Sequence, residues 1–228
     1  MNSWENIPNW EYKNENDDNV YEYLKKRFPE LDMGRIIKEK KILAFDLWRY
    51  AKVYDEGGLY ADSDVSKSNG FESSMSKLGG CKVILGIEAD SRTKGDWWVG
   101  VMKRQLQINQ WSFYSAPKQP ILKFVIDRII QRLQYRLDRE DKLRTVEVEE
   151  LTGPAIWTDT LKDYLRLVVG VDIEKEMKCG QSYKYDDICL LNIMGMAGNT
   201  AKSHSCPNNP ESDNFVLSTH HFEGSWKY

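Results

Sequence analysis

The chain has 228 residues, of which 41% are hydrophobic and 29% are charged, as in an ordinary globular protein with one substantial core. The formal net charge of −3 offers no basic surface for nucleic acid, so we expect no nucleic-acid partner. No run of about 18 apolar residues occurs, and we expect no membrane span within this sequence. The four cysteines lack the spacing of a zinc site, and they permit one or two disulfides without implying any.

In the first half of the chain, the sequence predicts helices followed by one short strand. A polar segment, residues 1–17, precedes a capped helix that is predicted to begin at 17–19 and to end before Pro29. Residues 31–41 predict a short helix or loop. The next helix is predicted to end at Gly57-Gly58, and its apolar stripe is Leu43, Leu47, Ala51 and Tyr54. A short buried strand, residues 59–61, follows.

The second half alternates further strands and helices. Residues 67–80 and 91–100 predict loops, and residues 83–87 predict a buried strand. Pro120 opens a long helix, whose buried stripe is Leu122, Val125, Ile129, Leu133 and Leu137. The charged run 138–150 predicts a solvated face or loop. A further helix begins at 152–154, with Trp157, Leu161, Leu165 and Val168 predicted to face inward. Strands at 188–193 and 215–217, with a loop at 195–210, complete the pattern of an α/β fold.

Acidic residues follow two of the predicted strands. Asp62-Ser63-Asp64 ends the strand 59–61, and because side chains alternate along a strand, we expect both carboxylates on the same side. Two close carboxylates repel each other unless one is protonated or a cation lies between them, and such hard oxygen ligands suit Mg²⁺ or Mn²⁺. Glu88 and Asp90 end the strand 83–87. In open α/β sheets ligands bind at the carboxyl ends of strands, so both acid pairs are expected to face one crevice.

The helix before the double glycine carries an acid and a base that lead toward the first acid pair. Asp46 and Arg49 are three residues apart and therefore lie on one flank of that helix. The alternative interpretation is a local ion pair within the helix. An isolated Asp-x-Asp is likewise often a solvated loop. The combination of helix, glycine turn and acid pair favours a functional site.

These motifs resemble the sugar-binding region of DXD-containing glycosyltransferases. The resemblance rests first on Asp46-x-x-Arg49, Tyr54, Gly57-Gly58, Tyr60 and Asp62-x-Asp64. The family includes fungal initiating α-1,6-mannosyltransferases, and its motif spacing recurs in the glucosyltransferase domains of large clostridial toxins. The later segments that resemble the fungal group, in the same order, are 88–90, Trp97-Trp98, 110–111, 120–122, 151–159 and 220–227. The similarity runs from about Pro8 to Lys227.

The resemblance implies a GT-A-like α/β fold in a single glycosyltransferase domain, residues 1–228. Its mixed central sheet is expected to carry helices on both faces. Family members have an apolar first strand before the position of Pro8-Asn9-Trp10, and here that strand is missing or replaced. The C-terminal tail, residues 219–228, is expected to close over the site. By resemblance the protein works in the Golgi lumen if an N-terminal anchor is missing from this sequence, and otherwise in the cytoplasm.

The implied activity is a metal-dependent retaining glycosyltransferase that moves a hexose to a glycan or another hydroxyl acceptor. Mannose from GDP-mannose is the favoured donor, with a UDP-sugar as the other choice, and Mn²⁺ (or Mg²⁺) is the implied cofactor. The implied metal ligands are Asp64, Asp62, His220 and His221. The implied donor-binding residues are Asp46, Arg49, Tyr60, Asp62, Gly153, Ser225 and Trp226. The implied catalytic residues are Asp62, Asp64, Arg49, Glu88 and Asp90.

Two other functions fit parts of the sequence. Asp62-Ser63-Asp64-Val65 after a short apolar strand also fits the nucleophile motif of haloacid-dehalogenase-like phosphatases, with Asp186-Asp187 as later metal ligands. That hypothesis leaves the glycine turn and the C-terminal histidines unexplained. The other alternative is a non-catalytic protein that binds a nucleotide-sugar, because the missing first strand could have abolished turnover.

Overall fold

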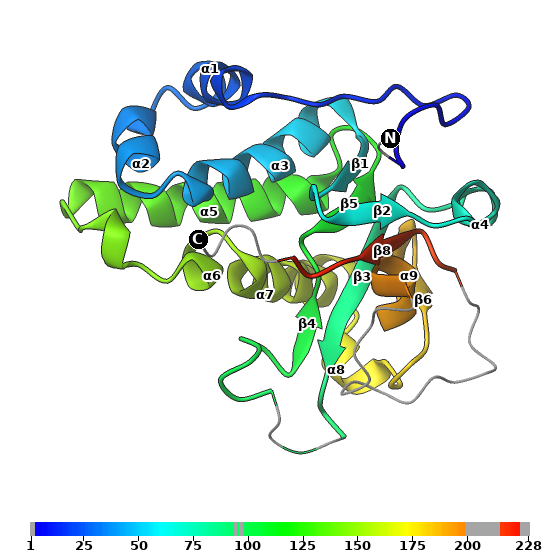
Figure 1. The fold of residues 1–228 in the computed structure, drawn as a ribbon. Helices are drawn as coiled ribbons and strands as arrows, with labels where there is room; N and C mark the ends of the chain where they lie inside the picture. Colours follow the sequence, from blue (N-terminus) through cyan, green and yellow to red (C-terminus); the bar gives the residue numbers. More distant parts are fainter. Residues whose placement is uncertain (1–2, 94, 96–97, 199–214, 224–228) are drawn as a thin grey trace.

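The computed structural model describes residues 3–93, 95, 98–198 and 215–223, and Figure 1 shows their arrangement. The first half contains α1 (Asp17–Arg27), α2 (Met33–Lys40), α3 (Ile42–Glu56), β1 (Gly58–Ala61), β2 (Val65–Lys67), α4 (Phe71–Lys77), β3 (Val83–Asp90), β4 (Leu106–Ile108) and β5 (Ser112–Ser115). The second half contains α5 (Pro120–Asp138), η1 (Leu143–Thr145), α6 (Val148–Leu151), α7 (Pro154–Tyr164), η2 (Leu165–Val169), α8 (Ile173–Glu176), β6 (Tyr183–Tyr185), β7 (Ile188–Leu191), α9 (Ile193–Ala197) and β8 (Ser218–His220).

The central sheet is mixed, with strand order β1-β5-β3-β7-β6 and β4 paired to the far end of β3. β3 and β7 run parallel, whereas β1 and β3 are both antiparallel to β5. β1, β3 and β7 therefore point in the same direction. Their carboxyl ends meet at one edge of the sheet, which is where open α/β sheets bind ligands.

Alternation along the strands divides the apolar residues between two faces of the sheet. In β3, Val83, Leu85 and Ile87 belong to the larger core under α3, α5 and α7, whereas Ile84 belongs to a smaller core with α4 and α9. In β7, the large-core residues Ile188 and Leu190 alternate in the same way with Cys189 and Leu191. The predicted α/β class, with a mixed sheet and helices on both faces, is confirmed (Figure 1).

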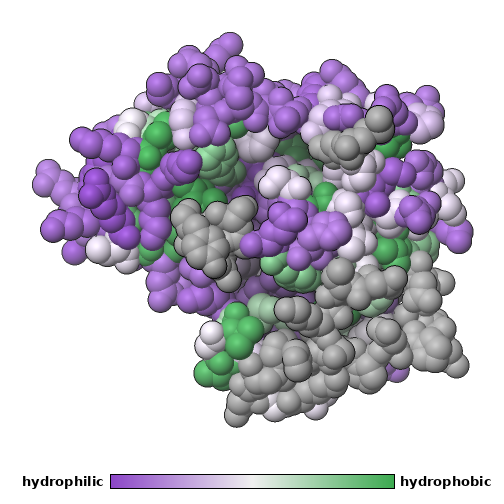
Figure 2. Space-filling view, in the orientation of Figure 1, coloured by the Kyte–Doolittle hydropathy of each residue, from purple (hydrophilic) through white to green (hydrophobic). Residues whose placement is uncertain are grey.

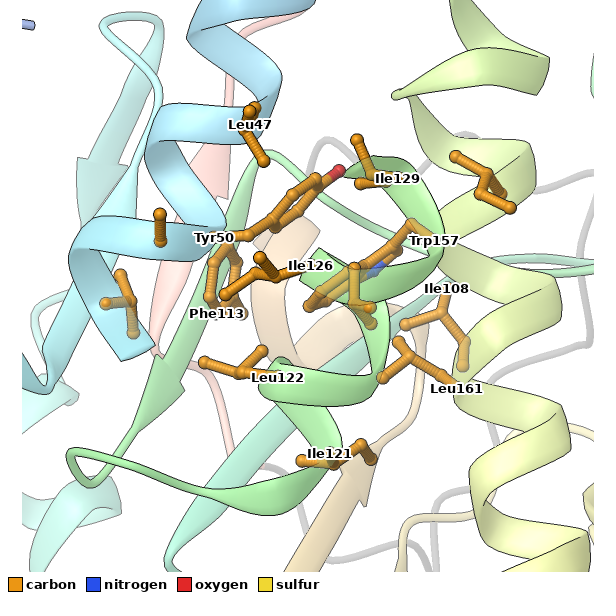
Figure 3. Close-up of a cluster of buried hydrophobic side chains, with 14 of the residues drawn as sticks. Leu47, Tyr50, Ile108, Phe113, Ile121, Leu122, Ile126, Ile129, Trp157 and Leu161 are labelled. Atoms are coloured by element: carbon orange, nitrogen blue, oxygen red, sulfur yellow. The ribbon is translucent and has the colours of Figure 1, made fainter. Parts of the chain in front are cut away.

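The larger core is built around aromatic rings from three elements (Figure 3). Tyr50 of α3 stacks on Trp157 of α7 with ring centroids 4.7 Å apart, and Phe113 of β5 lies 5.0 Å from Trp157. Trp157 is fully buried, and its indole N–H donates to the Asn109 carbonyl at 2.9 Å. The apolar stripe predicted for α5 is also buried, as expected. These contacts hold α3 in a fixed position relative to the sheet.

A second sheet has two strands, which come from the segment after the DXD motif and from the C-terminal segment. β2 pairs antiparallel with β8, with Val65 opposite His220. The N-terminal segment contacts β2 as well, because Trp4 Nε1 donates to the Val65 carbonyl at 2.7 Å and Ser3 Oγ accepts from Lys67 N at 2.8 Å. Residues 3–16 contain no strand, as the sequence predicts.

Cys81 and Cys189 form a disulfide that ties the segment before β3 to β7, with their Cα atoms 5.8 Å apart. Cys179 is also disulfide-bonded. The sequence permitted these bridges but gave no reason to expect them. Within the described ranges, no helix is long and apolar enough to cross a membrane.

Three local predictions are wrong. Residues 67–80 include the helix α4, because Phe71, its first residue, is fully buried against Trp4 and anchors the helix. Val168 is 63% exposed, because the π-helical turn η2 has more residues per turn than an α-helix and rotates this position off the buried face. The strand predicted at 188–193 begins where it was predicted but ends at Leu191, and the strand predicted at 215–217 is displaced to Ser218–His220.

We expect Trp157→Ala to lower the free energy of unfolding by about 3–5 kcal/mol, because it leaves a cavity between Tyr50 and Phe113. Urea denaturation followed by circular dichroism measures the change. Tyr135→Ala is the control, since Tyr135 is 56% exposed and should change stability by no more than about 0.5 kcal/mol. Equal losses in the two variants would contradict the central place given to Trp157.

Candidate active site

A tight turn brings α3 and the residues after β1 together. Gly57 and Gly58 have φ angles of 75° and 108°, which glycine adopts without strain. A Cβ atom at Gly57 would lie 2.9 Å from the backbone nitrogen of Pro117, so the turn has no room for a side chain there. The chain therefore reverses at once, and β1 runs back beside α3 toward Arg49.

Arg49 lies between two carboxylates in the interior of the protein. Its Nη2 atom is 3.1 Å from Asp46 Oδ1, and its Nη1 atom is 3.1 Å from Asp62 Oδ1. Asp46 is 1% exposed and Arg49 is 5% exposed. Asp46 and Arg49 do form the ion pair within one helix that the alternative interpretation expected, but the pair is buried and Arg49 extends it to Asp62. The structure brings together the helix pair and the first acid of the DXD motif.

Burial and charge act on these groups in opposite directions. Burial raises the pKa of Asp46 to about 6, although Arg49 and the Thr152 hydroxyl favour its charged form. Burial also disfavours the charged form of Arg49, but Asp62, Tyr60 and Asp46 outweigh it, so the pKa of Arg49 rises. At neutral pH the site therefore holds a guanidinium between carboxylates.

Further polar side chains surround this network. The Tyr60 hydroxyl donates to Asp62 Oδ1 at 2.5 Å, and the Arg49 guanidinium lies 5.0 Å from the centre of the Tyr60 ring. Thr152 Oγ1 donates to Asp46 Oδ2 at 2.7 Å, and the Tyr50 hydroxyl contacts the Thr152 carbonyl at 3.1 Å. Thr152 and Tyr50 were not among the site residues predicted from the sequence. The only signal for Thr152 was its place in the segment 151–159, which resembles the family.

The DXD residues form a turn rather than the end of a strand. β1 ends at Ala61, Asp62 N donates to the Trp111 carbonyl at 2.8 Å, and Val65 N donates to the Asp62 carbonyl at 3.0 Å. The strand alternation expected for Asp62 and Asp64 is therefore wrong. The chain turns here because Val65 begins β2, which pairs with β8 instead of continuing the central sheet.

The C-terminal segment binds Asp64 from two directions. Glu223 N donates to Asp64 Oδ2 at 3.1 Å, and His221 N donates to the Asp64 carbonyl at 2.9 Å. His220 Nε2 is 3.4 Å from Asp64 Oδ2, whereas His221 Nε2 contacts Ser66 Oγ at 2.8 Å and is exposed. Of the two predicted histidines, the structure thus places His220 beside the DXD motif.

His220 is held as a neutral imidazole. It stacks on Trp111 with ring centroids 4.4 Å apart, and burial lowers its pKa despite the nearby Asp64 and Asp62. A neutral imidazole is the form that binds a metal ion. Trp111 was quoted for the family resemblance but not predicted as a site residue.

The residues present fit a divalent cation, although they do not form a complete cage. Among the described residues, no group of three or more His, Cys, Asp or Glu side chains is placed to hold a metal ion. The side chains of Asp62 and Asp64 are 29% and 13% exposed, and their contacts with other described side chains and with Glu223 N use one oxygen of each carboxylate. Mg²⁺ in proteins is often held by one or two carboxylates together with water and substrate phosphates, so two aspartates suffice.

The second acid pair has two different environments. Glu88 Oε2 accepts a hydrogen bond from Gln107 Nε2 at 2.9 Å, and burial raises the pKa of Glu88 to about 6. Asp90 is 4% exposed and forms a two-point ion pair with Arg92, at 2.9 and 2.7 Å. Arg92 also donates to the carbonyl oxygens of Ile173 and Met177, at the two ends of α8. This arrangement leaves Glu88 more available to a ligand than Asp90.

The remaining predicted site residues fall into two groups. Gly153 lies between α6 and α7, where a Cβ atom would be 2.8 Å from Glu149 Cα, so close packing of the two helices explains the glycine. Ser225 and Trp226, together with Trp97, lie outside the described residues.

Figure 2 shows hydrophilic side chains gathered around a hollow on the face where α3, β2 and β8 lie in Figure 1.

The site region matches a known family. Residues 1–78 match the family described as "Glycosyltransferase sugar-binding region containing DXD motif". That segment contains Asp46, Arg49, Tyr60, Asp62 and Asp64. The DXD motif of this family generally binds a divalent metal ion.

Three curated proteins are similar over most of the chain. The "Initiation-specific alpha-1,6-mannosyltransferase" of Schizosaccharomyces pombe is 30% identical over 192 residues, which is 82% of this chain and 47% of that protein. The "Putative glycosyltransferase HOC1" of Saccharomyces cerevisiae is 27% identical over 82% of this chain and 49% of its own length. The Candida albicans "Initiation-specific alpha-1,6-mannosyltransferase" is 26% identical over 92% of this chain and 60% of that protein.

A solved structure, the "PaToxG Glycosyltransferase", is also similar, with a TM-score of 0.38 and 16% identity over 68% of this chain and 44% of that chain. At that identity and score, the likeness says nothing about activity. The chain spans about half the length of the first curated relatives it matches.

The matches confirm the family that the motifs indicate, the DXD-containing glycosyltransferases, with curated relatives of the initiating α-1,6-mannosyltransferase type. Residues 1–78 carry the sugar-binding region of that family. The class of protein predicted from the sequence, a glycosyltransferase, is therefore the class to which these relatives belong.

We expect the stability of Glu88→Gln to depend less on pH than that of the wild type. Between its ordinary pKa of 4.5 and the raised value of about 6, the folded protein holds the Glu88 proton more tightly than the unfolded chain does. The contribution of Glu88 to the free energy of unfolding therefore falls as the pH rises through this window, by up to about 2 kcal/mol. The variant should lack this contribution, whereas the contribution of Asp46, whose pKa is also raised to about 6, is the same in both proteins. Urea denaturation at about pH 4.5 and about pH 7.5 measures it, with the exposed Glu22→Gln as control.

Proposed function

We propose that this chain is a metal-dependent retaining glycosyltransferase that moves a hexose from a nucleotide diphosphate donor to a hydroxyl of a glycan. Mannose from GDP-mannose is the proposed donor, since two of the similar curated proteins carry mannosyltransferase names. The observation that carries the proposal is the buried Asp46–Arg49 pair and its contact with the partly exposed Asp62, beside Asp64 and His220 at the carboxyl edge of the sheet.

The charge of the site supports a metal-bound donor. The site has three carboxylates, those of Asp46, Asp62 and Asp64, and one guanidinium, that of Arg49. Because His220 is neutral, two negative charges are left uncompensated. A free diphosphate is repelled by such a site, whereas a divalent cation is attracted to it. The proposed ligands are Asp64 and Asp62, with His220 as a further candidate. Bound there, Mn²⁺ or Mg²⁺ supplies positive charge to the diphosphate as it leaves.

The protein's own groups orient the donor. Arg49 fixes Asp62 through a charged contact, and Tyr60 fixes the same oxygen through its hydroxyl. Glu88, held by Gln107 at the carboxyl end of β3, is the proposed acceptor of a hydrogen bond from a sugar hydroxyl. Asp90 remains a proposed site residue, but its ion pair with Arg92 assigns it first to orienting the loop after β3.

Calorimetric titration tests donor binding. We expect GDP-mannose to bind in the presence of Mn²⁺ and not in its absence, because the aspartates alone repel the diphosphate. Asp64→Asn should weaken this binding by about 100-fold or more, since it removes a charged metal ligand. Asp127→Asn is the matched control, because Asp127 is an exposed acid on α5 that pairs with Lys123.

The titration also includes UDP-glucose. Binding of UDP-glucose in place of GDP-mannose would keep the reaction class and change the donor. If neither nucleotide-sugar binds in a metal-dependent manner, the proposed function is wrong.

The phosphatase hypothesis conflicts with the topology. Asp186 and Asp187 form the turn before β7, whereas Asp62 follows β1. Because β1, β3 and β7 point in the same direction, the two acid groups lie at opposite edges of the sheet. They cannot share a metal ion.

Slow donor hydrolysis distinguishes an enzyme from a binding protein. We expect the wild type with Mn²⁺ to release free hexose from its donor without an acceptor, and Arg49→Ala to release it at least about 100-fold more slowly, because Asp62 loses its orienting partner. Chromatography of the released sugar measures both rates. Tight binding without any release would instead favour a non-catalytic binding protein.

A further inference from the structure

Thr152, at the junction between α6 and α7, contacts the Asp46–Arg49–Asp62 network. Thr152 follows α6, and the next residues, Gly153 and Pro154, begin α7. Thr152 N and Gly153 N both donate to the Val148 carbonyl at 2.9 Å, so the backbone of this junction is fixed. Thr152 is fully buried, and its branched side chain has few rotamers. Its hydroxyl therefore has a set direction.

Two residues of one helical face meet Thr152. Asp46 and Tyr50 are four residues apart on α3, so they lie on the same face. Asp46 Oδ2 accepts from the Thr152 hydroxyl at 2.7 Å, and the Tyr50 hydroxyl contacts the Thr152 carbonyl at 3.1 Å. α3 is thus connected to the junction by a side-chain contact and a backbone contact at the same residue.

The Thr152 hydroxyl determines which oxygen of Asp46 faces Arg49. With Oδ2 occupied, Oδ1 is the atom that meets Arg49 Nη2 at 3.1 Å. Arg49 then presents Nη1 to Asp62 Oδ1, also at 3.1 Å. Without the hydroxyl, Oδ2 becomes a buried acceptor with nothing to satisfy it, and the carboxylate turns both oxygens to the guanidinium. That rotation draws Nη1 away from Asp62.

We infer that Thr152 is a positioning residue of the donor site: its hydroxyl fixes Asp46, and through Asp46 it holds the Arg49 guanidinium against the first aspartate of the DXD motif. The inference rests on the proposed function. Thr152 acts through two buried charged groups, Asp46 and Arg49.

Three variants test the inference. Thr152→Val removes the hydroxyl and keeps the shape of the side chain. Thr152→Ser keeps the hydroxyl. Thr160→Val is the matched control, because Thr160 is also a fully buried threonine, on α7, but its hydroxyl donates to the Ile156 carbonyl of its own helix. Thermal unfolding of each variant shows whether it is folded at the assay temperature.

The first measurement is donor affinity by calorimetry with Mn²⁺, together with the donor KM and kcat of hydrolysis. We expect Thr152→Val to bind the donor about tenfold or more weakly, the loss typical of one hydrogen bond to a charged group. Thr152→Ser should stay within about threefold of the wild type, and Thr160→Val should match it. The inference is wrong if Thr152→Val binds the donor as the wild type does, or if Thr152→Ser is as impaired as Thr152→Val.

The second measurement needs no donor. Crystal structures of the ligand-free wild type and of Thr152→Val should differ in the contact of Arg49 Nη1 with Asp62 Oδ1, which is 3.1 Å here. An unchanged contact in Thr152→Val would overturn the inference even if the proposed function holds. Failure of the wild type to bind any nucleotide-sugar would instead overturn the proposed function, so the two failures are separate.

Discussion

The arrangement of the site depends on one buried guanidinium, that of Arg49, between Asp46 and Asp62. Taking these charges out of water is costly, and the cost is offset only while all three groups keep their partners. Removing one member of such a network typically costs about 3–5 kcal/mol, because it leaves an uncompensated buried charge. The buried charges thus lower the stability of the interior, and they fix the direction of the Asp62 carboxylate.

Distant parts of the chain supply the partners that this network needs. The double glycine returns the chain so that Asp62 meets Arg49, and antiparallel pairing of β2 with β8 brings His220 to Asp64. The first and last parts of the described chain therefore both contact the segment around the DXD motif. The N-terminal segment contacts β2 through the side chains of Trp4 and Ser3, whereas the C-terminal segment contacts Asp64 through the backbone N–H groups of His221 and Glu223.

The segment from α6 to α7 connects both acid pairs. On one side Thr152 donates to Asp46. On the other, Arg104 is held by Glu150 and Asp159 at 2.6–2.9 Å, and the backbone N–H groups of residues 103 and 104 hold the Gln107 side chain that donates to Glu88. The segment from α6 to α7 thus orients both the Asp46–Arg49–Asp62 network and the end of β3. This shared support keeps two groups from separate strands in one relative position.

The sequence by itself determined those features of the fold and the site that depend on a local residue pattern. The stripe of α5, the turn at Gly57-Gly58, the acids after β1 and the acids in the last residues of β3 could be predicted, because periodicity and glycine conformation act over a few residues. Only the tertiary structure decided which groups meet. The tertiary structure buries the Asp46–Arg49 pair and places Asp62 and Asp64 in a turn. It also places the imidazole of His220 beside Asp64 and the Thr152 hydroxyl beside Asp46. These contacts join residues up to 156 positions apart, and no local pattern in one sequence specifies such a pairing.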